Sequence, residues 1–330
     1  MATKPLAWDE IAARLARVLG EPVRGGLPLT PGRSSRTTWA AYGGRVGPLV
    51  VKARCGDRAY EKTAWCAARL PLLAARGYPV PSIVWHGMVR DAWHVTVQNR
   101  LLGHPLTTLD GRLLEEVLRL VERQAGAAIP AGDRDFTSYI ANVLFDDWDE
   151  VWTDAVRAGG AAGPLCARIR RWLQPVWGLR LPPSDYAHND LNLSNILTDG
   201  DQVTGVVDWD EFGLGSRALD LVVLALDCQE RGAHAAADRL LASAASAVGG
   251  AGLRCLVSYR ALAALAENTR EGQASHAEIQ AIEAVLAKLR APRNEPAGLA
   301  GCPLSSEMAA RAAEEDADVR PAAGTFRTRP

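Results

Sequence analysis

Two short polar segments joined by a predicted hairpin place the strongest constraint on how this chain folds. The first, residues 188–195, reads HNDLNLSN, and the second, residues 208–210, reads DWD at the end of an apolar strand. Residues 195–207 predict the hairpin, because two short apolar stretches flank a turn at Asp199-Gly200. The hairpin would bring the second polar segment back beside the end of the first.

The polar side chains of these segments suit phosphoryl transfer. That reaction needs an acceptor hydroxyl held in line, a carboxylate that accepts its proton, and Mg²⁺ over the phosphates. A loop can place Asp190 at the acceptor, with Asn195 five residues later and Asp208 thirteen after that. Carboxylate and amide oxygens are the hard ligands that Mg²⁺ prefers. The pattern therefore indicates one base and two metal ligands.

The order of these motifs resembles the aminoglycoside phosphotransferase and choline kinase family, relatives of the protein kinases, over residues 25–290. The resemblance implies an α+β, protein-kinase-like fold with a small N-terminal antiparallel-sheet lobe and a larger, mainly helical C-terminal lobe. It also implies Asp190 as the catalytic base and Asn195 and Asp208 as Mg²⁺ ligands, with ATP or GTP as cosubstrate.

Hydrophobic periodicity agrees with a sheet-rich first part and a helical second part. The predicted elements are a helix closed by Gly20, strands over 27–30, 37–42 and 48–53, a helix over 58–76, strands over 83–88 and 93–98, and helices around 114–121, 136–151, 168–176 and 219–289 with a break at Gly249-Gly250. We therefore expect a nucleotide-binding lobe over 1–98, a catalytic and substrate-binding lobe over 99–294, and a largely disordered tail over 295–330.

Lysine is scarce in this chain, and one lysine lies in a chemically informative place. Of the 37 basic residues only four are lysine, which codon preference alone would explain. Lys52, however, follows the apolar stretch 49–51, where a half-buried ammonium without an anion is costly. A nucleotide phosphate would satisfy it, as the strand lysine of kinases does. The alternative is an edge-strand lysine whose ammonium extends to water.

Further nucleotide contacts are predicted around Lys52. Glu61, on the following helix, is the candidate ion-pair partner, although a spacing of nine residues is short and a surface position is the alternative. The turn that precedes Lys52 and the stretch after the last strand of the lobe occupy the positions of a phosphate-covering loop and a hinge. The residues predicted there are Gly32, Ser34 and Ser35 for the phosphates, and Gln98 and Arg100 at the hinge.

Three residues near the motifs are predicted to support them, and a fourth, Asn189, departs from the family's pattern. His188 is expected to orient the loop by hydrogen bonds, and Asp220 resembles the aspartate that braces the family's catalytic loop. Asn189 replaces the small glycine often found there, and Asn tolerates unusual backbone angles. Asp210 either supports the metal site or caps a helix.

An acidic stretch is a candidate surface for a cationic acceptor. Between residues 133 and 154 the one base is Arg134, and Trp148 and Trp152 could add ring-face contacts. The seven acids there are Asp133, Asp135, Asp146, Asp147, Asp149, Glu150 and Asp154. A solvated helix face is the alternative, and the same choice applies to Glu267 and Glu271.

Composition excludes several other classes of protein. A formal net charge of −1 gives no footprint for nucleic acid. No run of about 18 apolar residues is present, so we expect no membrane contact. Asp9 and Glu10 stand where a signal peptide would be apolar, and the six cysteines form no CxxC pair. We expect a cytoplasmic protein with reduced thiols, as a monomer or homodimer.

The sequence thus predicts a small-molecule kinase that transfers the γ-phosphate of ATP or GTP to a hydroxyl. An antibiotic is the leading acceptor class, in particular a cationic one such as an aminoglycoside or a basic peptide, and phosphorylation would give resistance by inactivation. Two alternatives stay open. One is a metabolic kinase of the same family acting on an amino alcohol, sugar or nucleoside. The other is a catalytically inactive nucleotide-binding protein.

Overall fold

The structure of the chain is a computed structural model that describes residues 6–29, 38–90, 93–128, 135–146, 151–157, 159–271 and 276–290. The described residues through Leu289 belong to one compact unit. The predicted lobe boundary between residues 98 and 99 falls within this unit and stays a prediction. The tail predicted over 295–330 lies outside the described residues.

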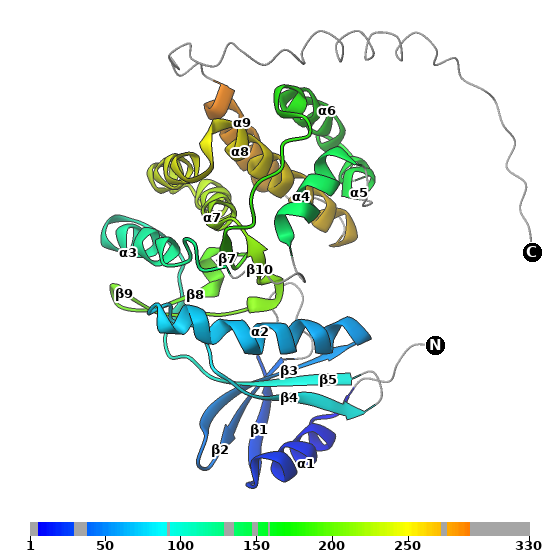
Figure 1. Ribbon diagram of the computed structural model, residues 1–330, viewed down its shortest axis with the longest axis vertical. Helices are drawn as coiled ribbons and strands as arrows, with labels where there is room; N and C mark the ends of the chain where they lie inside the picture. The colour runs from blue at the N-terminus through cyan, green and yellow to red at the C-terminus, as the bar shows by residue number, and fades with distance from the viewer. Residues whose placement is uncertain are drawn as a thin grey trace, which may run out of the picture. The chain divides into compact units, whose positions relative to one another are not determined.

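The N-terminal part is a five-stranded antiparallel sheet with the strand order β1-β2-β3-β5-β4. Its helices α1 and α2 lie on opposite faces of the sheet (Figure 1). The elements are α1 (Trp8–Leu19), β1 (Val23–Pro28), β2 (Thr38–Gly43), β3 (Gly47–Cys55), α2 (Asp57–Ala75), β4 (Ile83–Arg90) and β5 (Trp93–Asn99).

Alternation along β3 and β5 divides the sheet into an apolar and a polar face. Leu49, Val51 and Ala53 are fully buried and share one hydrophobic core with Ile11 and Leu15 of α1. Because successive side chains of a strand point to opposite faces, the residues between them face α2. The alternation thus puts a polar strip of β3, which includes Lys52, under α2.

The C-terminal part consists of helices around a buried central helix, α7, ten of whose fourteen residues are buried. The helix α8 packs along it and breaks at Gly249, where φ is 71°, as the sequence predicted. The helices are α3 (Gly111–Glu122), α4 (Phe136–Phe145), α5 (Val151–Arg157), α6 (Ala162–Leu173), α7 (Arg217–Glu230), α8 (His234–Glu271) and α9 (His276–Arg290). The α+β fold class predicted from the sequence is confirmed.

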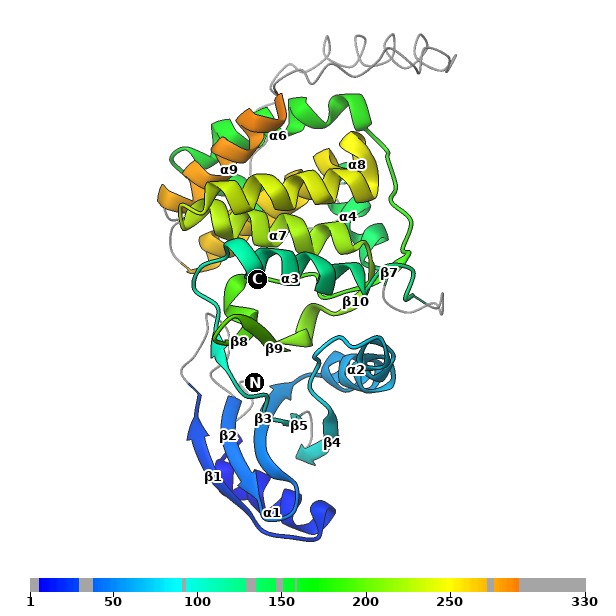
Figure 2. The same ribbon diagram turned by 90° about the vertical axis from the view of Figure 1, so that its left-hand side faces the viewer.

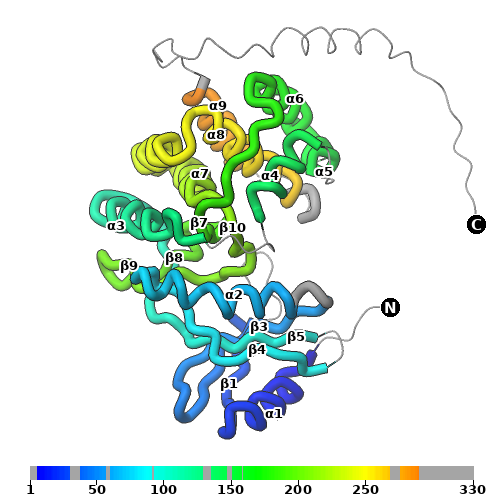
Figure 3. Tube along the Cα trace, in the orientation of Figure 1, coloured from blue at the N-terminus to red at the C-terminus, as the bar shows by residue number. Residues whose placement is uncertain are grey.

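Short strands and 3₁₀ turns lie between the N-terminal sheet and helices α3 and α7 (Figure 2). They form a sheet of order β6-β8-β9 and the pair β7–β10. Their bounds are β6 (His104–Pro105), β7 (Asp185–Ala187), η2 (Leu193–Asn195), β8 (Ile196–Asp199), β9 (Gln202–Val206), η3 (Trp209–Glu211) and β10 (Gly213–Gly215). The turn η1 (Gln174–Val176) follows α6 and contacts α6 and α8. Figure 3 follows the chain from β5 past this layer into α3. The predicted hairpin is β8–β9, in which Ile196 pairs with Val206.

Within the described residues, one helix is long and apolar enough to raise the question of a membrane. Residues 234–267 of α8 could cross a bilayer by length and composition, with a mean hydropathy of 1.5 over the best window. Within the protein, however, α8 packs against α7, α5 and α6. These contacts account for its apolar side chains as those of a core helix.

Candidate active site

The β8–β9 hairpin brings the two polar motifs together. The amide of Val207 donates to the carbonyl of Asn195 at 2.9 Å, so the chain returns beside the end of the 188–195 loop just before Asp208. Asp208 has φ 65°, a left-handed conformation that Asp tolerates better than most residues. The juxtaposition expected from the sequence is therefore formed by backbone pairing.

Lys52 joins this cluster from the polar face of β3. Its Nζ donates to Oδ1 of Asp208 at 2.5 Å, and only 13% of its side chain is exposed. Burial lowers the pKa of Lys52, an effect that the Asp208 carboxylate opposes. Burial alone would raise the pKa of Asp208, but the Lys52 ammonium keeps it below its ordinary value. The pair is thus held in its charged form.

The residues beside Lys52 fit a divalent cation with oxygen ligands. Nδ2 of Asn195 donates to the carbonyl of Asp190 at 2.9 Å, which leaves the amide oxygen of Asn195 available. The carboxylate of Asp208 is the second hard oxygen donor. Within the described part of the chain, no group of three or more His, Cys, Asp or Glu could hold a metal ion. Mg²⁺ here would complete its shell with water and phosphate oxygens.

Asp190 lies at the end of the cluster that faces the helices. Burial raises its pKa to about 6, Arg260 lowers it, and the nearby carboxylates of Glu267, Asp208 and Glu211 raise it. A general base works best when its pKa is near the working pH. Asp190 is thus poised to be mostly ionised at neutral pH and still able to take a proton.

The loop that carries Asp190 is braced from α7. Asp220 is fully buried and accepts from the amides of His188 at 2.9 Å and Asn189 at 2.7 Å. Nε2 of His188 lies 2.8 Å from the carbonyl of Val207, which ties the loop to the end of β9. Asn189 has φ 66°, the unusual angle that the sequence anticipated. The supporting roles predicted for His188 and Asp220 are confirmed by these contacts.

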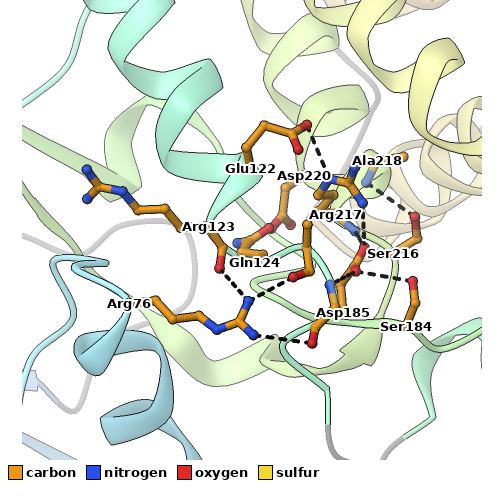
Figure 4. Close-up of polar contacts among 12 residues, drawn as sticks. Arg76, Glu122, Arg123, Gln124, Ser184, Asp185, Ser216, Arg217, Ala218 and Asp220 are labelled. Atoms are coloured by element: carbon orange, nitrogen blue, oxygen red, sulfur yellow. Dashed lines mark hydrogen bonds and ion pairs between the residues drawn. The ribbon is translucent and has the colours of Figure 1, made fainter.

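Sequence reasoning missed a second layer of this brace, which Figure 4 shows. Nε2 of Gln124, after the end of α3, donates to Asp220 at 2.9 Å and to the hydroxyl of Tyr78 at 3.1 Å. Arg76 of α2 donates to the carbonyls of Arg123, Ala125 and Gly126. Gln124 and Asp220 are 96 positions apart, so no local pattern could have revealed the contact.

Of the predicted nucleotide contacts, those at the hinge are described by the structure and those of the phosphate-covering loop are not. Gln98 is buried and lines a small cavity with Lys52, while the exposed Arg100 donates its backbone amide to the carbonyl of Pro48 at 2.9 Å. Gly32, Ser34 and Ser35 lie outside the described residues.

The pairing predicted for Glu61 is corrected by the structure. Glu61 is exposed on α2, and the carboxylates that pair with Lys52 in the described part of the chain are Asp208 and Asp210. The reason is helical phase, because the α2 residues that line the cavity with Lys52 are Lys62, Thr63, Cys66 and Leu70. Glu61 falls outside that stripe.

A larger cavity of about 570 Å³ opens beside the catalytic loop, a size typical of ligand sites. Its lining combines Asn192 and Ser194 of that loop with residues of α7, α8, α9 and the turn after α7: Val223, Leu226, Asp227, Glu230, Arg231, Arg260, Ala264, Ala277, Glu278, Ala281 and Ile282. Arg231 pairs with Asp227 at 2.6 Å and Arg260 with Glu267 at 3.2 Å. The cavity therefore carries three carboxylates and two guanidinium groups.

The described residues of the acidic stretch that was predicted to bind a cationic acceptor lie away from this cavity. Asp135 accepts from the amides of Thr137 and Ser138 and caps α4. Asp146 pairs with Arg180 at 3.1 Å, and Asp154 is largely buried beside Arg157. These three acids have structural partners, and none of them lines the cavity. Trp152 donates its Nε1 to the carbonyl of Val143 at 2.8 Å, and Glu267 pairs with Arg260. Asp133, Asp147, Trp148, Asp149, Glu150 and the side chain of Glu271 lie outside the described residues.

The cavity acids were not predicted, although one local signal exists. Asp227 and Glu230 lie three residues apart in the last turn of α7, so they share one face. Oδ2 of Asp227 also accepts from the amide of Leu193 at 2.8 Å, which links this wall to the catalytic loop.

Comparison with known proteins gives one family match and one curated relative. Residues 26–256 match the model of the phosphotransferase enzyme family, APH. Hygromycin-B 4-O-kinase of Escherichia coli is 26% identical over 210 residues, which are 57% of this chain and 58% of the relative. The match therefore spans less than two thirds of that relative's length.

Solved structures show the same fold at low identity. Aminoglycoside phosphotransferase APH(4)-Ia, in a ternary complex with ADP and hygromycin B, aligns with a TM-score of 0.63 and 17% identity over 86% of this chain and all of the other. APH(3'')-Id of Streptomyces rimosus aligns with a TM-score of 0.52 and 17% identity over 78% and 99% of the two chains.

Proposed function

This chain belongs to the phosphotransferase enzyme family, and we propose from its site that it transfers the γ-phosphate of ATP or GTP to a hydroxyl of a small molecule. The observation that carries the proposal is the convergence of a strand lysine, a hairpin aspartate and a loop aspartate. Lys52 lies 2.5 Å from Asp208, and Asn195 ties Asp208's strand to the loop of Asp190. These are the parts that phosphoryl transfer requires.

Each residue has a distinct part in the proposed reaction. Lys52 contributes a compact positive charge for the nucleotide phosphates, and Asp190 accepts the proton of the acceptor hydroxyl. Asn195 and Asp208 would hold Mg²⁺, which when bound neutralises charge on the phosphates. Asp220 and His188 keep the loop in place, so that Asp190 is presented in one orientation.

The acceptor is assigned to the cavity of about 570 Å³ beside the catalytic loop. Its wall carries three carboxylates against two guanidinium groups, and the excess of negative charge favours a cationic acceptor through charge complementarity. Similar proteins point the same way, since one is named as a hygromycin-B kinase and one solved structure holds hygromycin B. We therefore propose an aminoglycoside-like antibiotic as the acceptor and inactivation of it in the cytoplasm as the consequence.

The test is a nucleotide-consumption screen with purified protein, Mg²⁺, and ATP and GTP in separate reactions. The library contains hygromycin B, streptomycin, basic peptide antibiotics, amino alcohols, sugars and nucleosides. Phosphorylation of an aminoglycoside, checked by product mass and by drug susceptibility of a host that expresses the protein, is the expected result. A product only from a metabolite would move the enzyme to a metabolic role. Nucleotide binding without any product would indicate an inactive binding protein.

A further inference from the structure

The two aspartates of the DWD motif flank a tryptophan that fixes their positions. Trp209 is 6% exposed, and its Nε1 donates to the carbonyl of Val206 at 2.8 Å. Its ring packs edge-on against Tyr78 at 5.5 Å and Phe212 at 5.2 Å between centroids. The turn η3 is thereby anchored in the core, and both neighbouring carboxylates project from a rigid backbone.

Both carboxylates of this motif reach cations of β3. Nζ of Lys52 lies 2.5 Å from Oδ1 of Asp208 and 3.7 Å from Oδ1 of Asp210. Oδ2 of Asp210 pairs with Arg54, which lies two residues after Lys52 and therefore on the same face of the strand. Asp210 thus binds two adjacent cations of one strand, one with each oxygen.

The two aspartates face different demands. Asp208 is a candidate Mg²⁺ ligand, so its carboxylate cannot serve only the lysine. The helix α2 supplies no described carboxylate to the cavity that Lys52 lines, because the residues it presents there are Lys62, Thr63, Cys66 and Leu70. Among the described residues that line that cavity, Asp210 is the one acid. Arg54 pairs with its Oδ2 atom.

We propose that Asp210 is the positioning residue for Lys52. It takes the role of ion-pair partner that the sequence analysis predicted for Glu61. Asp210 and Arg54 keep the Lys52 ammonium directed at the phosphate site when Asp208 is engaged elsewhere. This inference rests on the proposed function, since it concerns the same nucleotide site. It assigns Asp210 neither to the metal nor to a helix cap.

The experiment measures the affinity of the full chain for Mg²⁺ with AMP-PNP, and separately with GMP-PNP, by isothermal titration calorimetry. Asp210→Asn should weaken binding of the preferred nucleotide roughly tenfold, as expected when one partner of a partly buried charge pair is removed. Glu61→Gln tests the rival partner and should bind as the wild type does. Asp201→Asn, on an exposed turn residue, is the matched acid-to-amide control.

Unchanged binding by Asp210→Asn would overturn the inference, because the carboxylate would then have no effect on nucleotide affinity. Tighter binding would overturn it as well, because the carboxylate would then only repel the phosphates. A weakening caused by Glu61→Gln alone would overturn it too. A double-mutant cycle distinguishes an action through Lys52 from a merely structural role of Asp210. In a Lys52→Ala background, Asp210→Asn should cause no further loss of nucleotide affinity. Equal loss in both backgrounds would contradict an action through Lys52.

Folding and the proposed function are checked separately. Thermal unfolding without nucleotide should show Asp210→Asn close to the wild type, and Asp210→Ser replaces it under the same criteria if the amide variant unfolds. Failure of the wild type to bind either nucleotide would defeat the proposed function and this inference together. Binding by the wild type with no change in Asp210→Asn would defeat this inference alone.

Discussion

The nucleotide side and the acceptor cavity of the candidate active site are built in different ways. On the nucleotide side, Lys52 and Asp208 are 156 positions apart in sequence yet only 2.5 Å apart in space. The acceptor cavity is wide, about 570 Å³, and its guanidinium groups are already paired with carboxylates. The comparison teaches that a few close contacts fix the chemistry, while substrate choice rests on a broad surface of mixed charge.

The largest effect is expected where the two sides meet, at the proposed base. Asp190→Asn should lower kcat by about 10²- to 10⁴-fold, the usual contribution of a general base, with nucleotide affinity kept. Steady-state kinetics with the acceptor found in the screen, together with nucleotide titration, measures both. Undiminished turnover would remove Asp190 from the base assignment.

The next effect is confined to the nucleotide side. Lys52→Arg keeps the charge but replaces a compact ammonium by a planar guanidinium, and kcat/KM for the nucleotide should fall about 10- to 100-fold. Lys62 and Lys288 form exposed pairs with Glu211 and Asp238, whose loss costs little. Lys62→Arg and Lys288→Arg should therefore be nearly silent, and equal effects at all three positions would assign the scarcity of lysine to codon preference alone.

The third effect is that of a cavity residue, Arg260, on the pKa of the proposed base. The base must be ionised, so the rate should fall as the pH drops through about 6, the pKa of Asp190. Arg260 lowers that pKa, and Arg260→Gln should therefore move the acid limb of the kcat profile to higher pH. Arg239→Gln, an exposed arginine paired with Glu115, is the control that should leave the limb in place.

The smallest effect should be confined to the acceptor cavity. Glu230→Gln removes one of the three wall carboxylates and should raise KM for a cationic acceptor by about two- to fivefold, since partly exposed charges contribute little each. The KM for the nucleotide should not change. An equal rise for a neutral acceptor, or for the nucleotide, would show that Glu230 acts on the structure of the site rather than on acceptor charge.

The parts of the site that the sequence predicted are those specified by local pattern. The β8–β9 hairpin follows from two apolar stretches around Asp199-Gly200, and it brings Asp208 back to Asn195. The expected brace at Asp220 also agrees with the structure. The residues that were missed depend on distant parts of the chain: Gln124 contacts Asp220 across 96 positions, and Glu230 faces a cavity closed by α8 and α9.

The sequence by itself determined the fold class and the chemical types at the centre of the site, because periodicity and motif spacing act over a few residues. The tertiary structure decided which carboxylate serves Lys52. Glu61 was the nearer candidate in sequence, but the phase of α2 turns it to solvent, and the turn anchored by the buried Trp209 places Asp208 and Asp210 beside the lysine instead. Partner choice of this kind depends on how rigid elements pack, since a charge pairs with whatever opposite charge the packing places within reach.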